Sequence, residues 1–173
     1  MYLISIYFDD QSGRQIQNYI DVVARATGNA FMTDNNVPPH ITIAAFETRS
    51  EHTAEMIFDG IAQKTGRNTI NWVSVGAFLP SVIYIAPILN EYLHRLCEVA
   101  YEEIEGIEDV RIDDKYTPFN WMPHATISKK LSEEQLRTAF ETMQKRFTVF
   151  ESQVTKIGLA RTNPFGNLKE IQL

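Results

Sequence analysis

The sequence has 173 residues, of which 44% are apolar and 22% are charged. This length and balance fit one globular domain with a substantial core. The formal net charge of -6 argues against tight capture of long nucleic acid, which requires clustered lysine and arginine. Since the sequence shows no signal-peptide pattern and no apolar run of membrane-spanning length, we expect a cytoplasmic protein that does not associate with membranes.

The first half of the chain is expected to alternate strands and helices. Residues 2–8 are apolar and β-branched, which is typical of a buried strand. A helix should follow, with Ser12 and Gln15 in a capping-box pattern and Gly28 as its C-terminal stop. The remaining expected elements are a strand over 40–46, a helix beginning near Ser50 and a strand over 69–79.

From residue 81 the same order of elements begins again. The expected elements are strands over 82–86, 124–128 and 148–160, with helices over 93–104 and from a capping box at Ser132 and Gln135. The single cysteine, Cys97, lies on the apolar stripe of the first of these helices, which indicates a packing role. We therefore predict one bilobal domain, residues 1–173, built from two pseudo-repeats spanning approximately 1–79 and 81–173.

One short string occurs in both halves at the corresponding strand. Residues 39–43 read Pro-His-Ile-Thr-Ile, and residues 123–127 read Pro-His-Ala-Thr-Ile. Because side chains alternate across a strand, His40 and Thr42 should share one face of their strand. Packing of the two halves about an approximate two-fold axis would bring two imidazoles and two hydroxyl groups to one cleft.

These side chains suit the cleavage of a phosphodiester. Breaking a P–O bond needs a base for the attacking oxygen and an acid for the leaving oxygen. Histidine, with an unperturbed pKa of about 6.5, can take either role. The sequence leaves open whether His40 or His124 is the base. The hydroxyls of Thr42 and Thr126 can donate hydrogen bonds to non-bridging phosphate oxygens without a metal.

The string has two other interpretations. One copy alone would indicate a hydrogen-bonded histidine at the start of a strand, but two copies at equivalent positions favour catalysis. The chemical alternative is a metal site. Neither His40 nor His124 has a carboxylate or cysteine at the usual ligand spacing, and threonine is a poor zinc ligand. We therefore expect no metal and no cofactor.

The paired His-apolar-Thr-apolar strings resemble the 2H phosphoesterase superfamily, which includes bacterial 2'-5' RNA ligase and cyclic phosphodiesterase proteins, over nearly the whole chain. The resemblance implies an α+β, bilobal LigT-like fold, duplicated as β-α-β-α-β halves with antiparallel sheets lining a central cleft and helices outside. It also implies catalytic roles for His40 and His124 and phosphate binding by Thr42 and Thr126.

The expected activity is metal-independent hydrolysis of a cyclic phosphodiester on a nucleotide or RNA end, of the 2',3'-cyclic phosphate type. The alternatives are 2'-5' RNA ligation and a noncatalytic module that binds nucleotides or RNA ends. The expected partner is a small nucleotide or short RNA end, and we expect a monomer. Members of the superfamily that process RNA often carry arginine shortly after a motif, where this chain has Lys129 and Lys130.

Further candidate substrate contacts lie around the two strings. The loop before the second string carries Tyr116, Phe119 and Trp121, whose rings either stack on a base or are buried beneath the loop. Phe46 shares the face of His40 if no bulge intervenes, and it then either lines the cleft or closes its floor. Candidate phosphate or leaving-group contacts, weighed against ordinary solvated roles, are Lys129 and Arg161.

Overall fold

The structure is a computed structural model that describes residues 1–162 and 166–173. Its elements in chain order are β1 (Tyr2–Phe8), α1 (Asp10–Thr27), α2 (Phe31–Asp34), β2 (Ile41–Glu47), α3 (Glu51–Lys64), β3 (Asn68–Phe78), β4 (Val82–Pro87), α4 (Glu91–Ile104), β5 (Arg111–Ile112), the 3-10 turn η1 (Asp114–Tyr116), β6 (Ala125–Ser128), α5 (Glu133–Arg146), β7 (Phe150–Arg161) and β8 (Gly166–Gln172). Every main element expected from the sequence is present. The elements α2, β5, η1 and β8 are additions to the expected order.

The strands of the described residues form one antiparallel sheet. Its order is β5-β2-β1-β7-β3-β4-β6, and β8 pairs with β7 off this path. The two long strands β7 and β3 pair at its centre. On either side of them, β1 with β2 and β4 with β6 occupy equivalent places. The predicted α+β fold with an antiparallel sheet is confirmed.

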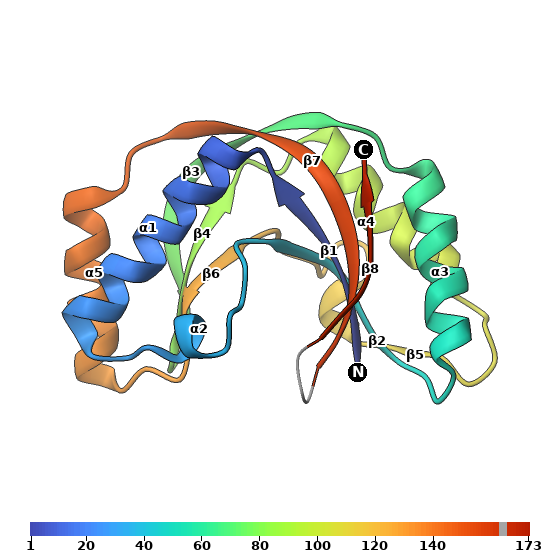
Figure 1. Cartoon of the computed structure of the whole chain (residues 1–173), viewed down its shortest axis with the longest axis horizontal. Coiled ribbons are helices and arrows are strands. Elements are labelled where there is room, and N and C mark those ends of the chain that lie inside the picture. Colours follow the sequence, from blue (N-terminus) through green and yellow to red (C-terminus); the bar gives the residue numbers. More distant parts are fainter. Residues whose placement is uncertain (163–165) are drawn as a thin grey trace.

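The helices form two layers beneath the ends of the arched sheet (Figure 1). α1 packs on α5 and on β6, whereas α4 packs on α3 and on β2. Each layer therefore combines one helix from each half of the sequence, and the halves are intertwined. None of the helices in the described residues combines the length and apolar character needed to cross a membrane.

The helix starts show which sequence signals determine the helix boundaries. The capping box at α5 is confirmed, since Ser132 accepts from the Gln135 backbone N–H and Gln135 reaches back to the Ser132 N–H. The expected box at α1 is wrong. Asp9 is the N-cap there, and its carboxylate accepts from the Ser12 N–H at 2.9 Å. Aspartate caps a helix as well as serine does, so the sequence offers two N-cap residues, Asp9 and Ser12. The helix uses Asp9 and begins one turn earlier than expected.

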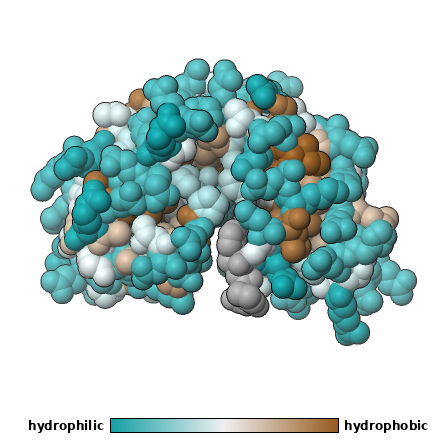
Figure 2. Space-filling model, in the orientation of Figure 1, coloured by the Kyte–Doolittle hydropathy of each residue, from teal (hydrophilic) through white to brown (hydrophobic). Residues whose placement is uncertain are grey.

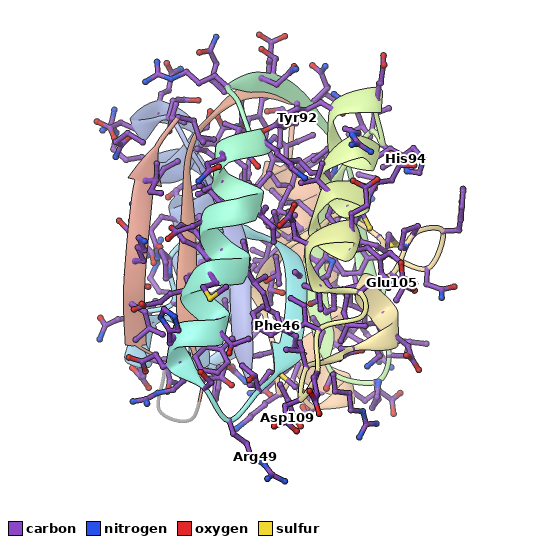
Figure 3. All side chains as sticks on the ribbon, turned by 90° about the vertical axis from the view of Figure 1, so that its right-hand side faces the viewer. Phe46, Arg49, Tyr92, His94, Glu105 and Asp109 are labelled. Carbon is purple, nitrogen blue, oxygen red and sulfur yellow. The ribbon has the colours of Figure 1, made fainter. Side chains whose placement is uncertain are left out.

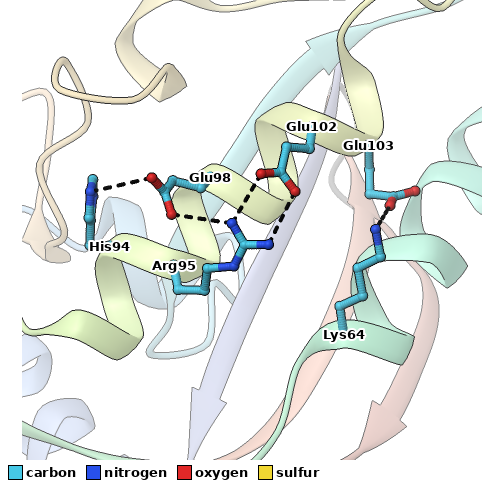
Figure 4. Close-up of polar contacts among 6 residues, drawn as sticks. All are labelled: Lys64, His94, Arg95, Glu98, Glu102 and Glu103. Atoms are coloured by element: carbon cyan, nitrogen blue, oxygen red, sulfur yellow. Dashed lines mark hydrogen bonds and ion pairs between the residues drawn. The ribbon is translucent and has the colours of Figure 1, made fainter.

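Polar contacts on the outer surface join α3 to α4 (Figure 4). Arg95 forms ion pairs with Glu98 and Glu102 on its own helix, at 3.3 and 3.0 Å. Lys64, at the end of α3, pairs with Glu103 on α4. Exposed pairs contribute little stability individually. Glu102 and Glu103, near the end of α4, thus belong to ion pairs on the outer surface.

Candidate active site

The two motif strands lie towards opposite edges of the sheet, and the arch of the sheet brings them together (Figure 1). β2 and β6 are in contact although they lie on opposite sides of the central strands. Figure 1 shows their starts close together beneath the arch, and the space-filling view is hollowed between the two helical walls (Figure 2). His40 and His124 directly precede these strands. The fold therefore brings the two histidines together.

Both histidines are oriented by the same backbone contact. Nδ1 of His40 lies 2.7 Å from the Pro38 carbonyl oxygen, and Nδ1 of His124 lies 2.8 Å from the Met122 carbonyl oxygen. A carbonyl only accepts, so Nδ1 carries the proton in each contact. In the neutral imidazole Nε2 is then left with its lone pair. Each ring therefore has Nε2 available to take up or deliver a proton.

The surroundings disfavour the charged form of both rings. Burial lowers the pKa of His40, and the nearby positive charges of His124 and Lys129 lower this pKa further, against the hydrogen bond to the Pro38 carbonyl. Burial also lowers the pKa of His124, against its own carbonyl contact. The influence of His124 on His40 again indicates that the two imidazoles are close in space.

Thr42 is held by contacts from several elements. The Ser5 hydroxyl on β1 donates to Thr42 Oγ1 at 3.4 Å, and the side chains of Thr42 and Tyr116 are hydrogen-bonded. The indole Nε1–H of Trp121 donates to the Thr42 backbone oxygen at 3.0 Å. Thr126 on β6 is less deeply buried than Thr42. Both hydroxyls thus belong to strands of the sheet, two residues after the motif histidines.

A β-bulge follows the threonine in both motif strands. On β2 the register passes from Thr42 to Ala44, and on β6 it passes from Thr126 to Ser128. Each bulge contains the motif isoleucine as its extra residue. The same irregularity at the same place in both copies supports the predicted equivalence of the two strings.

The bulge corrects the expectation for Phe46. Simple alternation places Phe46 on the face of His40, but the extra residue reverses the alternation beyond it. Phe46 pairs with Tyr2 and stacks on its ring at 5.9 Å, with no exposed surface. Figure 3 looks onto α3 and α4 and shows Phe46 between these helices. It belongs to the core on the helix-covered face of the sheet.

The two basic candidates lie in different environments. Arg161 pairs with Tyr2 in the sheet, on the face of Phe46, and its guanidinium lies 3.7 Å from Glu51 on α3. This contact favours the ordinary solvated role that was the alternative for Arg161. Lys129 follows β6 and influences the pKa of His40. Its ammonium lies 5.0 Å from the centre of the Phe31 ring, at the rim of the site.

The three loop aromatics are not arranged as one stacking surface. Trp121 is buried and serves Thr42 through its indole N–H, as described above. Tyr116 also points to Thr42, and burial followed by the Asp113 carboxylate raises the pKa of its hydroxyl. Phe119 is 92% exposed and lies 5.6 Å from the His94 ring, on α4. The loop thus supports the first motif strand.

Sequence reasoning missed the residues that flank each histidine. Tyr7 lies 6.2 Å from His40 between ring centres, and the Lys156 ammonium lies 4.8 Å from the Tyr7 ring centre. Phe78 and Tyr84 lie 4.8 and 5.4 Å from the His124 ring. The signal available in the sequence was a glycine within a strand, which often marks a close approach by another group; both central strands contain one.

The arrangement defines a class of protein that sets two His-x-Thr strands against each other in one antiparallel sheet. Each strand presents an imidazole Nε2 and a hydroxyl. Within residues 1–162 and 166–173, no group of three or more His, Cys, Asp or Glu side chains is placed to hold a metal ion. The side chains that the two motif strands present are imidazoles and hydroxyls, which can exchange protons and form hydrogen bonds.

Comparisons with known proteins identify the family. A family model described as the 2'-5' RNA ligase superfamily matches residues 11–164. Solved structures with the same fold include E. coli LigT complexed with ATP (TM-score 0.61, 15% identity, 99% of this chain and 96% of that chain) and a phosphoesterase (0.62, 17%, 99% and 97%). E. coli LigT complexed with 3'-AMP is similar (0.63, 16%, 99% and 96%). No curated protein matches the sequence. The chain belongs to the 2'-5' RNA ligase superfamily, the 2H phosphoesterases.

Proposed function

We propose that this protein hydrolyses a cyclic phosphodiester, of the 2',3'-cyclic phosphate type, on a small nucleotide or a short RNA end. The observation that carries the proposal is the matched pair of histidines, each donating Nδ1–H to a carbonyl and leaving Nε2 free. The family includes phosphoesterases and RNA ligases, and E. coli LigT has been crystallised with ATP and with 3'-AMP.

The reaction needs two proton transfers and no electron transfer. One imidazole accepts a proton from water as the water oxygen attacks phosphorus. The other donates its proton to the ribose oxygen as the P–O bond breaks, so that a phosphomonoester is left. The anionic phosphate stabilises an imidazolium beside it, which offsets the effect of burial on the histidine pKa. Thr42 and Thr126 would donate to the non-bridging oxygens.

The substrate is proposed to be small. A net charge of -6 disfavours the binding of a long RNA, whose phosphates would need many lysine and arginine contacts. Lys129 near His40 can attract a single phosphate group, although lysine binds it less specifically than arginine. Because both motifs lie in one chain, a monomer suffices for the reaction.

The test is turnover of 2',3'-cyclic AMP in buffer treated with a chelator. We expect His40→Ala and His124→Ala each to lower kcat by about 10²–10⁴, the usual contribution of a proton-transfer group. His52→Ala is the matched control, since His52 lies on the exposed face of α3. Unchanged turnover in either motif variant, or activity that appears only with added divalent metal, would contradict the proposal.

Ligation is the second candidate, because the family model is that of 2'-5' RNA ligases. It follows the same chemistry with a different attacking group: the 5'-hydroxyl of a ribose replaces water, a P–O bond of the cyclic phosphate breaks, and a new phosphodiester forms instead of a phosphomonoester. RNA ends with a 2',3'-cyclic phosphate and a 5'-hydroxyl would test it. Hydrolysis without any joined product would exclude ligation. Binding of nucleotides without turnover of any of these substrates would instead indicate a noncatalytic module.

A further inference from the structure

The two sides of the site can be compared position by position, because the strand register is equivalent in both halves. Thr42 on β2 pairs with Ser5 on β1, and Thr126 on β6 pairs with Tyr84 on β4. Ser5 and Tyr84 therefore occupy corresponding positions. Their partners on the central strands are Gly158 on β7 and Gly76 on β3, which correspond in the same way.

Each central glycine makes room for a tyrosine ring. A Cβ atom at Gly158 would lie 2.9 Å from the Tyr7 ring, and a Cβ atom at Gly76 would lie 2.5 Å from the Tyr84 ring. These separations are shorter than any van der Waals contact between carbon atoms. The absence of a side chain therefore lets both tyrosines lie flat on the sheet, one near each histidine.

The correspondence ends two residues further along the central strands. On the His40 side this position is Ala160, and on the His124 side it is Phe78. The Phe78 ring lies 4.4 Å from the Tyr84 ring at 33°, and 4.8 Å from the His124 ring at 80°. Among the described residues, two aromatic rings that contact each other therefore flank His124, whereas the ring of Tyr7 is the one near His40.

Charged groups flank the other histidine instead. Beside His40, the ammonium of Lys156 lies over the Tyr7 ring and pairs with Glu170 at 2.8 Å. By the same register, the counterparts of Tyr7 and Lys156 near His124 are the small residues Ala86 and Ser74. A substrate with one apolar, flat end would therefore distinguish the two sides.

Phe78 offers a free ring surface beside His124. It is 39% exposed, whereas Tyr84 is 9% exposed, so Tyr84 covers one face of Phe78 from behind. We propose that Phe78, supported by Tyr84, is the platform on which the nucleobase of the substrate stacks beside His124. This inference rests on the proposed function and adds the direction in which the nucleotide lies. Stacking of one base on an aromatic side chain corresponds to about 5- to 150-fold in affinity.

The test compares two substrates that contain the same five-membered cyclic phosphate. One is 2',3'-cyclic AMP, and the other is glycerol 1,2-cyclic phosphate, which has no base. We expect Phe78→Ala to lower the ratio of kcat/KM for the nucleotide to kcat/KM for the glycerol compound by about 5- to 150-fold. Phe78→Trp should restore the ratio, since indole also stacks. Phe140→Ala, at a partly exposed phenylalanine on α5, is the control and should leave the ratio unchanged.

Every outcome bears on the inference. An equal loss on both substrates would show that Phe78 only positions the His124 ring, and it would overturn the platform. An unchanged ratio in Phe78→Ala would also overturn it. If the unmodified protein cleaves neither compound, the proposed function fails, and the platform is then tested by calorimetry with 3'-AMP. Equal Kd values for the unmodified protein and Phe78→Ala would overturn it, whereas a 5- to 150-fold weaker Kd would support it.

Discussion

Replacing Gly76 by alanine would test whether the glycine is needed for the tyrosine that flanks His124. The new Cβ atom would lie 2.5 Å from ring atoms of Tyr84. This ring cannot simply swing away, since it is buried and lies against the rings of Phe78 and His124. Inserting a methyl group into such packing typically costs about 1–3 kcal/mol.

A second glycine provides the matched reference. Gly13 lies within α1, and a Cβ atom there would meet nothing within 4 Å. Alanine is favoured over glycine by about 0.5–1 kcal/mol within either a helix or a strand. Both variants share this gain, so the free energy of unfolding of Gly76→Ala should lie about 1–3 kcal/mol below that of Gly13→Ala.

Urea denaturation of the two variants measures this difference, provided that the slope with urea concentration is the same. In the background of Tyr84→Ser, which introduces the residue found at the corresponding position 5, the clash is absent. In that background, Gly76→Ala should no longer lower the free energy of unfolding relative to Gly13→Ala. Equal free energies of unfolding for Gly76→Ala and Gly13→Ala would show that the Tyr84 ring does not require a glycine at position 76. A lower free energy of unfolding for Gly76→Ala that persists in the Tyr84→Ser background would show the same.

Three further predictions concern the site and its support. Burial lowers the pKa of both motif histidines and neighbouring positive charges lower that of His40 further, so NMR titration from high to low pH should show His124 protonating first, below about pH 6.5. Trp121→Phe removes the donor to the Thr42 carbonyl and should lower the free energy of unfolding in urea by about 1–3 kcal/mol. Burial, with the Glu98 charge, raises the pKa of the Cys97 thiol to about 11, so iodoacetamide at pH 8 should modify it only after unfolding.

The order of elements could be predicted because each main element carries its own local signal. Apolar periodicity distinguishes strands from helices, and the box at Ser132 fixes the start of α5. The short elements carry weak signals. α2 has four residues and β5 has two, so no periodic pattern can build up. The strand β8, over Gly166–Gln172, alternates only weakly because it contains polar residues throughout.

The four motif residues could be predicted because one string is repeated. The flanking side chains could not, since their positions depend on pairing between strands that are distant in sequence. The bulge at Ile43 has no residue signature of its own, and it changes the face of Phe46. Arg161 illustrates the same limit, because its face follows from its pairing with Tyr2. A register, unlike a periodicity, is a property of two segments.

The central strands also explain how the distance between the two histidines is maintained. Residues 150–154 of β7 pair with β3, while residues 154–161 of the same strand pair with β1. β3 is shared in the same way between β7 and β4. Moving one motif strand away from the other would therefore break ladder hydrogen bonds at the middle of a continuous sheet.

Helix packing imposes the same restraint from outside the sheet. α1 from the first half covers β6 of the second, and α4 from the second half covers β2 of the first. Neither half can shift without disturbing a helix of the other. A site of fixed width selects substrates by the groups that flank it. Under the proposed function, the difference between Phe78 and Ala160, at corresponding positions of β3 and β7, would therefore give the two histidines unequal surroundings.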